Sequence, residues 1–164
     1  MSGSEVELIQ IMEGHSAGVN WCAFHHDQHY IVSSSDDKKI KLWKYNSTRC
    51  WEFDQFSGHT NNVSSVIFHP KYDVLISNSE DKTTKVWDLI RKVEVDSFTN
   101  KELDRFWVVA AHPDNFYFAC GSDSALYVFT LFKDRVPCTM VGGNYLCYGQ
   151  RKAVRVFDTR TNIE

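Results

Sequence analysis

The chain has 164 residues, of which 43% are hydrophobic and 14% aromatic, and its formal net charge is -3. This composition is too apolar for a disordered tail, and the acidic balance argues against a protein that binds nucleic acid through general charge attraction. No apolar run approaches the roughly 18 residues that cross a bilayer, and the N-terminus lacks the pattern of a secretion signal. The five cysteines include no C-x-x-C pair, which is typical of reduced thiols in the cytosol.

The chain contains an internal repeat with an offset of 44 residues. Four markers recur at this offset: Gly14-His15 as Gly58-His59, Phe24-His25 as Phe68-His69, Asp37 as Asp81, and Trp43 as Trp87. A third copy follows 42 to 43 residues later, and we match its His112-Pro113 to His69-Pro70, Asp123 to Asp81, and Phe129 to Trp87. A period of this size indicates stacked supersecondary units. We expect residues 1–12 to form a lead-in, as part tag or edge strand, and residues 13–164 to form the repeat domain.

The second copy shows what one period contains. Short runs rich in β-branched and aromatic residues alternate with turn signals, which predicts strands at Val63–Phe68, Val74–Ser77, Thr83–Trp87 and Val93–Phe98. A weaker fourth copy predicts a hairpin from Asn144–Tyr148 and Ala153–Asp158, with Arg151 in place of the turn aspartate. Four strands per period are typical of a propeller blade, so we predict an all-β partial β-propeller of about three to four blades, each a four-stranded antiparallel sheet.

The recurring polar markers predict a hydrogen-bonded relay in each of the first two copies. A buried histidine can donate to a carboxylate from one ring nitrogen and accept a hydroxyl proton on the other, and a buried tryptophan indole needs an acceptor. The predicted relays contain His15, Ser33, Asp37 and Trp43 in the first copy, and His59, Ser77, Asp81 and Trp87 in the second. We interpret these groups as structural rather than catalytic, because buried polar residues usually belong to satisfied networks.

These markers resemble the WD-repeat family. Its signature is present as Gly58-His59, then Asp81, then Val86-Trp87-Asp88, and the first copy matches it with Gly14-His15, Asp37 and Leu42-Trp43-Lys44. The third copy departs, since Lys101-Glu102 stands in place of Gly-His, Ala119 in place of the serine, and Phe129 in place of the tryptophan. Its relay cannot form in full, so we expect this blade to be less rigid.

The resemblance narrows to the coatomer alpha subunits. It is carried, in order, by Gly18–His25, Asn61–Ser65, Ser77–Lys82 and Asp104–Pro113, and it points to the late blades of that family's N-terminal propeller. The resemblance implies a non-enzymatic vesicle coat protein that is cytoplasmic, peripheral on Golgi membranes and transport vesicles, and active in Golgi-to-ER retrograde transport. Its implied partners are other coat subunits and cargo tails with dilysine signals. The family's main signal-binding residues lie on earlier blades, so we expect the cargo pocket to be incomplete in this chain.

The number of blades raises the question of closure. At 44 residues per repeat, 164 residues hold fewer than four blades, whereas propellers generally close with about four to eight. An open arc leaves unpaired strand edges and apolar faces. The chain is then a fragment of a larger protein, one of two arcs that complete a ring, or a small strained ring. We favour a fragment that self-associates through its open blade edges.

Loops that share one rim of a WD-repeat propeller form a candidate partner-binding surface. This candidate rim consists of Asn20, Trp21, Asn61, Asn62, Glu80, Lys82, Asp104, Arg105 and Phe106. Aromatic and arginine side chains are the usual energetic anchors of an interface. For Trp21 and Trp107, the sequence leaves core and interface equally open.

Other residue groups lead us to expect neither a metal nor a cofactor. The run His25–His29 holds three histidines, but His25 occupies the same repeat position as His69 and His112, which favours a structural role. Two cysteines fall in predicted strands, where structural thiols are common. We interpret a cluster of lysines around the first tryptophan-bearing strand as a solvated strand edge rather than a site for nucleic acid or anionic lipid: Lys38, Lys39, Lys41 and Lys44. Two alternatives stay open, a different WD-repeat scaffold such as a ubiquitin-ligase substrate adaptor and a metal- or thiol-dependent enzyme.

Overall fold

The computed structural model describes residues 6–100, 102, 104–131, 138–141, 145–150 and 153–158, with side chains described as far as residue 131. The chain divides into two compact units, Met1–Leu131 and Phe132–Glu164. The secondary structure of the described residues consists of β-strands and turns, as the all-β prediction requires.

The described part of the first unit contains three antiparallel sheets. The first has the order β1-β2-β3-β4, from β1 (Val19–Phe24), β2 (Tyr30–Ser35), β3 (Lys39–Tyr45) and β4 (Cys50–Ser57). The second has the order β5-β6-β7-β8, from β5 (Val63–Phe68), β6 (Val74–Ser79), β7 (Thr83–Asp88) and β8 (Val93–Thr99). The third has the order β11-β10-β9, from β9 (Phe106–Ala111), β10 (Tyr117–Ser122) and β11 (Leu126–Thr130).

The second unit contains one described sheet of order β12-β13-β14, from β12 (Cys138–Val141), β13 (Tyr145–Gln150) and β14 (Ala153–Asp158). Strands β13 and β14 pair antiparallel, from Tyr145 opposite Asp158 to Gln150 opposite Ala153. The hairpin expected near the C-terminus is therefore confirmed. Asn144 and Arg151, which the prediction placed at its strand and its turn, lie outside the described residues.

The predicted partial propeller is confirmed, with two blades of four strands and, within the described residues, two blades of three. The four strands expected in the second copy are all present, and β6 runs two residues further than predicted, to Ser79. The β2–β3 and β6–β7 turns share one backbone geometry, because Lys38 and Lys82 both adopt a left-handed conformation with φ of 68° and 72°. The sequence repeat is therefore also a repeat of turn conformation.

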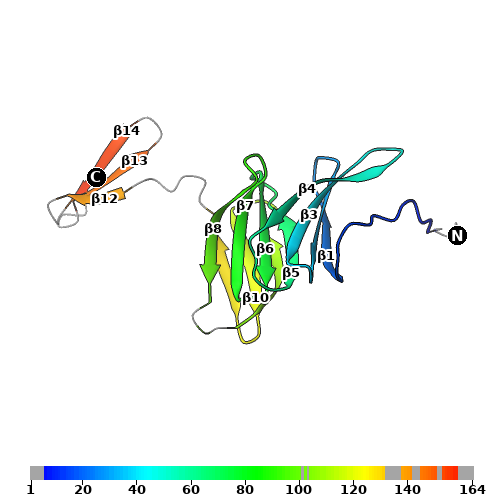
Figure 1. Ribbon diagram of the computed structural model, residues 1–164. Helices are drawn as coiled ribbons and strands as arrows, with labels where there is room; N and C mark the ends of the chain where they lie inside the picture. Colours follow the sequence, from blue (N-terminus) through cyan, green and yellow to red (C-terminus); the bar gives the residue numbers. More distant parts are fainter. Residues whose placement is uncertain are drawn as a thin grey trace, which may run out of the picture. The chain divides into compact units, whose positions relative to one another are not determined.

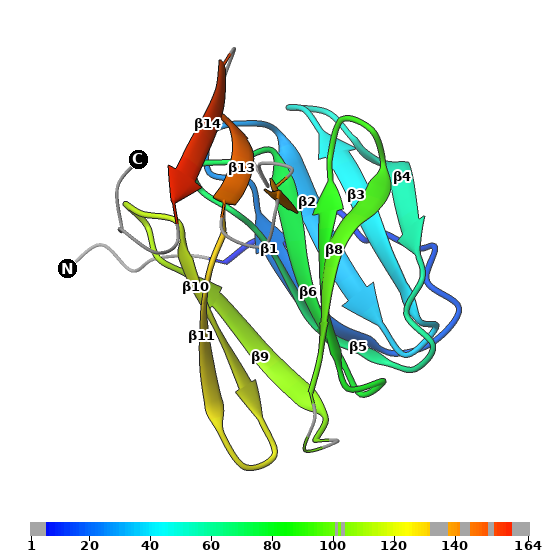
Figure 2. The same ribbon diagram turned by 90° about the vertical axis from the view of Figure 1, so that its left-hand side faces the viewer.

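The three sheets of the first unit stand side by side in chain order, coloured blue to cyan, green and yellow (Figures 1 and 2). Apolar side chains fill the seam between each neighbouring pair. The first seam joins Val32, Ile40, Leu42 and Phe56 of the first sheet to Val63, Val66, Phe68, Leu75 and Trp87 of the second. The second seam joins Ile76 to Phe106, Val109, Phe118 and Cys120. Burying one such side chain fully stabilises the fold by about 1.5–3 kcal/mol, so the seams hold the sheets together.

Within the described residues, no helix has the length and apolar character needed to cross a membrane.

Candidate functional site

The second sheet contains a complete hydrogen-bonded relay. His59 Nδ1 donates to Asp81 Oδ2 at 2.8 Å, and His59 Nε2 accepts from the Ser77 hydroxyl at 2.8 Å. The Trp87 indole nitrogen donates to the same Ser77 oxygen at 2.8 Å. The direction of each bond follows from chemistry, because a carboxylate only accepts and an indole N–H only donates. The relay ties the loop before β5 to β6, to the β6–β7 turn and to β7.

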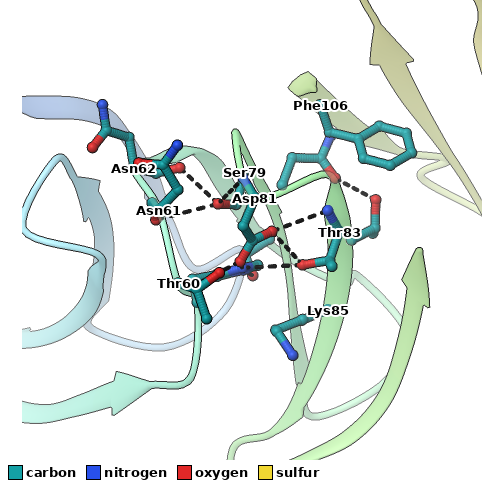
Figure 3. Close-up of polar contacts among 12 residues, drawn as sticks. Thr60, Asn61, Asn62, Ser79, Asp81, Thr83, Lys85 and Phe106 are labelled. Carbon is teal, nitrogen blue, oxygen red and sulfur yellow. Dashed lines mark hydrogen bonds and ion pairs between the residues drawn. The ribbon is translucent and has the colours of Figure 1, made fainter. Parts of the chain in front are cut away.

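The Asp81 carboxylate also organises the backbone around it (Figure 3). It accepts the backbone N–H groups of Thr60 at 2.9 Å and Thr83 at 3.0 Å, and the Thr83 hydroxyl at 2.5 Å. Burial on its own would raise the pKa of Asp81, but the hydrogen bonds from His59 and Thr83 hold this pKa well below its usual value. A carboxylate kept ionised by fixed donors serves as an anchor for the turn rather than as a proton carrier.

The first sheet repeats the relay. His15 Nδ1 donates to Asp37 Oδ2 at 2.8 Å, and His15 Nε2 accepts from the Ser33 hydroxyl at 2.7 Å. The Trp43 indole donates to Ser33 at 2.8 Å. Burial opposes ionisation of Asp37, but the hydrogen bond from His15 and two backbone N–H donors lower its pKa. The eight predicted relay residues thus form two matching networks.

A glycine precedes each relay histidine because the relay tryptophan lies against the backbone there. A Cβ atom added to Gly14 would lie 3.0 Å from Trp43 Cη2, and one added to Gly58 would lie 3.0 Å from Trp87 Cη2. This close approach links the Gly-His pair to the tryptophan, 29 residues further along in each repeat.

The third sheet has no such relay. The register of its strands also corrects the sequence alignment that placed Ala119 at the position of the relay serine. In the second sheet Ser77 lies opposite Val66, and in the third Cys120 lies opposite Val109. Cys120, and not Ala119, therefore takes the position of the relay serine. Burial raises the pKa of the Cys120 thiol to about 11, which leaves it a neutral, structural group.

The turn of the third sheet corrects a second match. The Ser79 hydroxyl accepts the backbone N–H of Asp81 at 3.0 Å, and the Ser122 hydroxyl accepts that of Ser124 at 3.3 Å. Ser124, and not Asp123, therefore takes the position of the relay aspartate. Four residues separate the paired Gly121 and Leu126, whereas five separate the paired Asn78 and Thr84, and this difference shifts the alignment at the turn.

The rim of the third sheet carries an exposed clamp in place of a relay. The Trp107 indole donates to Asp123 Oδ1 at 2.7 Å, and the backbone N–H of Arg105 donates to Asp123 Oδ2 at 3.0 Å. The Arg105 guanidinium stacks 4.8 Å from the centre of the Trp107 ring, and its Nη1 lies 3.6 Å from Glu80 of the second sheet. Trp107 is 36% exposed, so this side chain lies at the rim and not in the core.

The other predicted rim residues lie at the surface or partly buried beneath it. The Asn20 amide donates to Asp36 at 2.7 Å, and the Asn62 amide donates to Glu80 at 3.1 Å. Asp104 accepts the Ser122 hydroxyl at 3.3 Å. Exposed or half-buried side chains also include those of Trp21, Asn61 and Lys82.

Phe106 does not belong to the rim. Its side chain is 0% exposed, and its ring centre lies 5.5 Å from that of Tyr127 and 6.2 Å from that of Phe98. The prediction is wrong here because neighbouring residues of a strand point to opposite faces, so Phe106 faces the second seam while Trp107 faces outward.

Side-chain donors join neighbouring sheets at equivalent positions, a feature that sequence reasoning missed. Asn20 of β1 donates to the Val63 carbonyl of β5 at 3.1 Å, and Ser64 of β5 donates to the Phe106 carbonyl of β9 at 2.6 Å. Asn78 of β6 also donates to the backbone of β9, at 2.6 Å. The sequence did offer one signal for these bonds: Asn20 and Ser64 are polar residues 44 positions apart, each on the first strand of its sheet.

Two segments of the chain, residues 6–44 and 50–88, match the family described as WD domain, G-beta repeat. Between them they contain every member of the two relays. The chain therefore carries two WD repeats.

Coatomer alpha subunits are similar to almost the whole of this WD-repeat chain. Coatomer subunit alpha-3 of Oryza sativa subsp. japonica is 49% identical over 162 residues, which is 99% of this chain and 13% of that protein. Coatomer subunit alpha-1 of Arabidopsis thaliana is 49% identical over 159 residues, or 97% of the chain and 13% of that protein. Coatomer subunit alpha of Saccharomyces cerevisiae is 51% identical over 154 residues, or 93% of the chain and 13% of that protein. The chain thus spans a small part of these relatives' length.

The histidine that directly follows the first strand of each sheet, β1, β5 or β9, caps the next turn. Nδ1 of each accepts a backbone N–H: His25 from Gln28 at 3.0 Å, His69 from Lys71 at 3.1 Å, and His112 from Asp114 at 3.1 Å. Burial, followed by the neighbouring His26, lowers the pKa of His25 and of His69, which favours the neutral imidazole that this acceptor role needs. In the part of the chain that the structure describes, no group of three or more His, Cys, Asp or Glu side chains is placed to hold a metal ion.

The lysines around β3 do not form one basic surface on the WD repeat. Lys41 is buried and its ammonium lies 2.6 Å from Glu52. Lys39 donates weakly to Gln55 at 3.5 Å. Lys44 stacks 5.5 Å from the ring centre of Tyr30. These lysines contact different side chains around β3.

Proposed function

We propose that this chain is a WD-repeat segment of a vesicle coat subunit of the coatomer alpha type and acts as a rigid scaffold for protein binding. The observation that carries the proposal is the similarity to coatomer alpha subunits, at about half identity over 93–99% of the chain. This similarity extends through the third repeat, which has no relay. On this proposal the whole protein is cytoplasmic, lies peripherally on Golgi membranes and transport vesicles, and acts in Golgi-to-ER retrograde transport.

A scaffold role suits the chemistry of the first two repeats. The buried polar groups of each relay are satisfied by one another, so they are engaged in holding loops and strands in place. Donors from Asn20, Ser64 and Asn78 fix neighbouring sheets to each other. A surface carried on such a framework loses little freedom when a partner binds, which favours affinity.

We further propose that the candidate rim, with Trp107 in place of Phe106, binds another coat subunit, and that Trp107 and Arg105 are its anchors. Trp107 is held by Asp123 and covered by Arg105, so an exposed aromatic ring is fixed before any partner arrives. Tryptophan and arginine are the residue types in which interface binding energy concentrates.

The binding test uses the purified chain and the other subunits of the coat, with affinity measured by biolayer interferometry. We expect Trp107→Ala to weaken binding at least about tenfold, which corresponds to about 1.4 kcal/mol. Phe53→Ala is the matched control, because Phe53 is an exposed aromatic residue on the outer strand β4. A chain that binds no coat subunit would contradict the coat proposal. Equal losses in both variants would contradict only the assignment of the rim.

Dilysine cargo recognition belongs to the proposed whole protein, and we infer that its pocket is incomplete in this chain. A complete propeller of the coatomer alpha type should bind a peptide ending in Lys-Lys-x-x in a fluorescence anisotropy titration, whereas this chain alone should not. Binding by the chain alone would contradict the incomplete pocket, and binding by neither protein would contradict the cargo function.

A further inference from the structure

His69 is a fully buried titratable side chain in the turn between β5 and β6, residues 69–73. The second sheet, which carries this turn, stands between the first and third sheets. The turn is approached by His26 of the first sheet, whose charge acts on His69, and by Phe116 of the third, which stacks on Tyr72. The burial of His69 therefore belongs to the inside of the first unit.

The neutral imidazole of His69 holds the turn closed. Its Nδ1 accepts the backbone N–H of Lys71 at 3.1 Å, and the backbone N–H of His69 donates to the Val74 carbonyl at 3.0 Å. A ring nitrogen that accepts a hydrogen bond carries no proton, so the proton of the neutral ring lies on Nε2. A second proton would have to go on Nδ1, where it would point at the Lys71 N–H and remove the acceptor that closes the turn.

The other ring nitrogen does not compensate for a positive charge. Nε2 of His69 is buried and has no hydrogen-bond partner among the described residues. A buried charge without a hydrogen-bonded partner is costly, so the closed turn favours the neutral ring. Proton uptake is therefore easier once the turn opens and water reaches the imidazole.

A stack of rings connects His69 to the third sheet. The centre of its ring lies 5.4 Å from that of Tyr72, with 25° between the ring planes. The Tyr72 ring in turn lies 5.1 Å from that of Phe116, with 13° between the planes, and Phe116 belongs to the β9–β10 turn. A rearrangement of the β5–β6 turn thus also removes a contact between the second and third sheets.

The charges around the turn act in the same direction as burial. Burial is the first cause that lowers the pKa of His69, and the neighbouring His26 of the β1–β2 turn is the second. Asp27 forms an ion pair with His26 at 2.9 Å. The remaining titratable groups on the three turns that meet here are His25, Lys71, Tyr72, Asp73, His112 and Asp114.

We propose that His69 is a proton-sensitive latch, whose neutral ring closes the β5–β6 turn and its stack on the third sheet, and whose protonation opens both. The unfolded pKa of histidine is about 6.5 and the folded pKa of His69 is lower, so the latch is fully closed above about pH 6.5 and weakens as the pH falls towards the folded pKa. This inference rests on the geometry of the turn and is independent of the coat function.

The test is amide hydrogen exchange of the full chain, followed by NMR between pH 7.5 and 5.5 and divided by the intrinsic chemical rate at each pH. This ratio gives the opening constant of each backbone N–H. For the Lys71 N–H we expect the opening constant to rise at least about threefold, and up to about tenfold, over this range, because the open turn takes up one proton. The His112 N–H, which donates to the Tyr117 carbonyl across the β9–β10 turn, should follow it.

The variant His69→Asn separates the proton from the cap. An asparagine Oδ1 can accept the same backbone N–H, as Asn46 does from Thr48 and Arg49 at 2.9 Å, and it does not titrate. We expect the opening constant of this variant to be independent of pH. His112→Asn is the matched control, because His112 caps the β9–β10 turn in the same way, and this variant should keep the wild-type pH response at Lys71. Circular dichroism checks that both variants stay folded.

An NMR titration of the His69 ring in the wild-type chain tests the latch without any variant, and we expect its midpoint below pH 6.5. A midpoint at or above pH 6.5 would overturn the proposal. So would a rise of less than about threefold at Lys71, or an unchanged pH response in His69→Asn. A response at Lys71 that His112 does not share would overturn the link through Tyr72 and Phe116.

Discussion

Removal of the Ser77 hydroxyl tests the relay most directly. The Ser77 oxygen accepts the Trp87 indole N–H and its proton is donated to His59 Nε2, both at 2.8 Å. Ser77→Ala leaves these two groups buried without partners. An orphaned buried donor or acceptor costs about 1–3 kcal/mol, so we expect the free energy of unfolding to fall by about 2–6 kcal/mol. Natural domains are stable by only about 5–15 kcal/mol, which makes this a large fraction.

The assay is urea denaturation followed by circular dichroism, with the midpoint and slope fitted for each protein. Ser57→Ala is the matched control, because Ser57 is an exposed strand serine on β4, and its loss should stay within about 0.5 kcal/mol. The reasoning would be refuted if Ser77→Ala cost no more than Ser57→Ala. A second variant replaces all four relay residues by the residue types found in the third sheet: His59→Glu, Ser77→Cys, Asp81→Ser and Trp87→Phe. Its loss of unfolding free energy should be smaller than the sum of the losses from the four single changes, because the groups are coupled.

Three further predictions concern pH, backbone geometry and thiol chemistry. Because the pKa of Asp81 is lower in the folded chain than the unfolded value of about 3.9, the stabilisation from this carboxylate is complete above about pH 4 and is lost as the pH falls towards the folded pKa. The difference in unfolding free energy between wild type and Asp81→Asn should therefore shrink below about pH 4 in an acid denaturation series. A difference that stays constant would contradict the linkage. Lys38→Gly should raise the unfolding free energy by up to about 1 kcal/mol, since Lys38 has φ of 68° and glycine adopts this conformation without strain. Lys39→Gly, the next residue along in β3, should lower the unfolding free energy. A change of the same sign in both variants would count against the argument. Alkylation at pH 8, mapped by mass spectrometry, should modify the exposed Cys22 at least about a hundredfold faster than Cys120, because burial raises the pKa of the Cys120 thiol to about 11. Comparable rates at the two cysteines would contradict the structural role of Cys120.

The relays could be predicted from the sequence because their chemistry restricts residue type. Only a small set of side chains can link a carboxylate to an indole through two ring nitrogens and a hydroxyl, so the recurrence of His59, Asp81 and Trp87 at one offset carries strong information. The strands of the second copy followed from β-branched runs between turn signals. Their ends moved by one or two residues, because strand ends depend on pairing with a neighbour, which local sequence does not determine.

The third copy was harder to predict because its alignment had no relay to guide it. The connection between paired strand residues is one residue shorter at the β10–β11 turn than at the β6–β7 turn, so matching Asp123 to Asp81 by residue type gave the wrong partner. The assignment of Phe106 to the rim failed because one residue of slip along a strand exchanges core and surface. The inter-sheet bonds from Ser64 and Asn78 could not be predicted from the sequence, because their acceptors are backbone carbonyls, which every residue carries.

The repeats with side chains described differ in an all-or-none manner, which follows from the energetics of buried networks. The first and second contain the complete relay, and the third has none of its four members. A half-satisfied polar network is less stable than an apolar core, so loss of one member favours replacement of the others. In the third sheet, Phe129 stacks on Phe118 at 4.9 Å between ring centres, and Cys120 is buried beside it in the same core. The polar groups at that rim bond to one another at the surface instead, with the Trp107 indole on Asp123 at 2.7 Å. Trp107 stays exposed there, and this is why the rim of the third repeat is the preferred place to look for a bound partner.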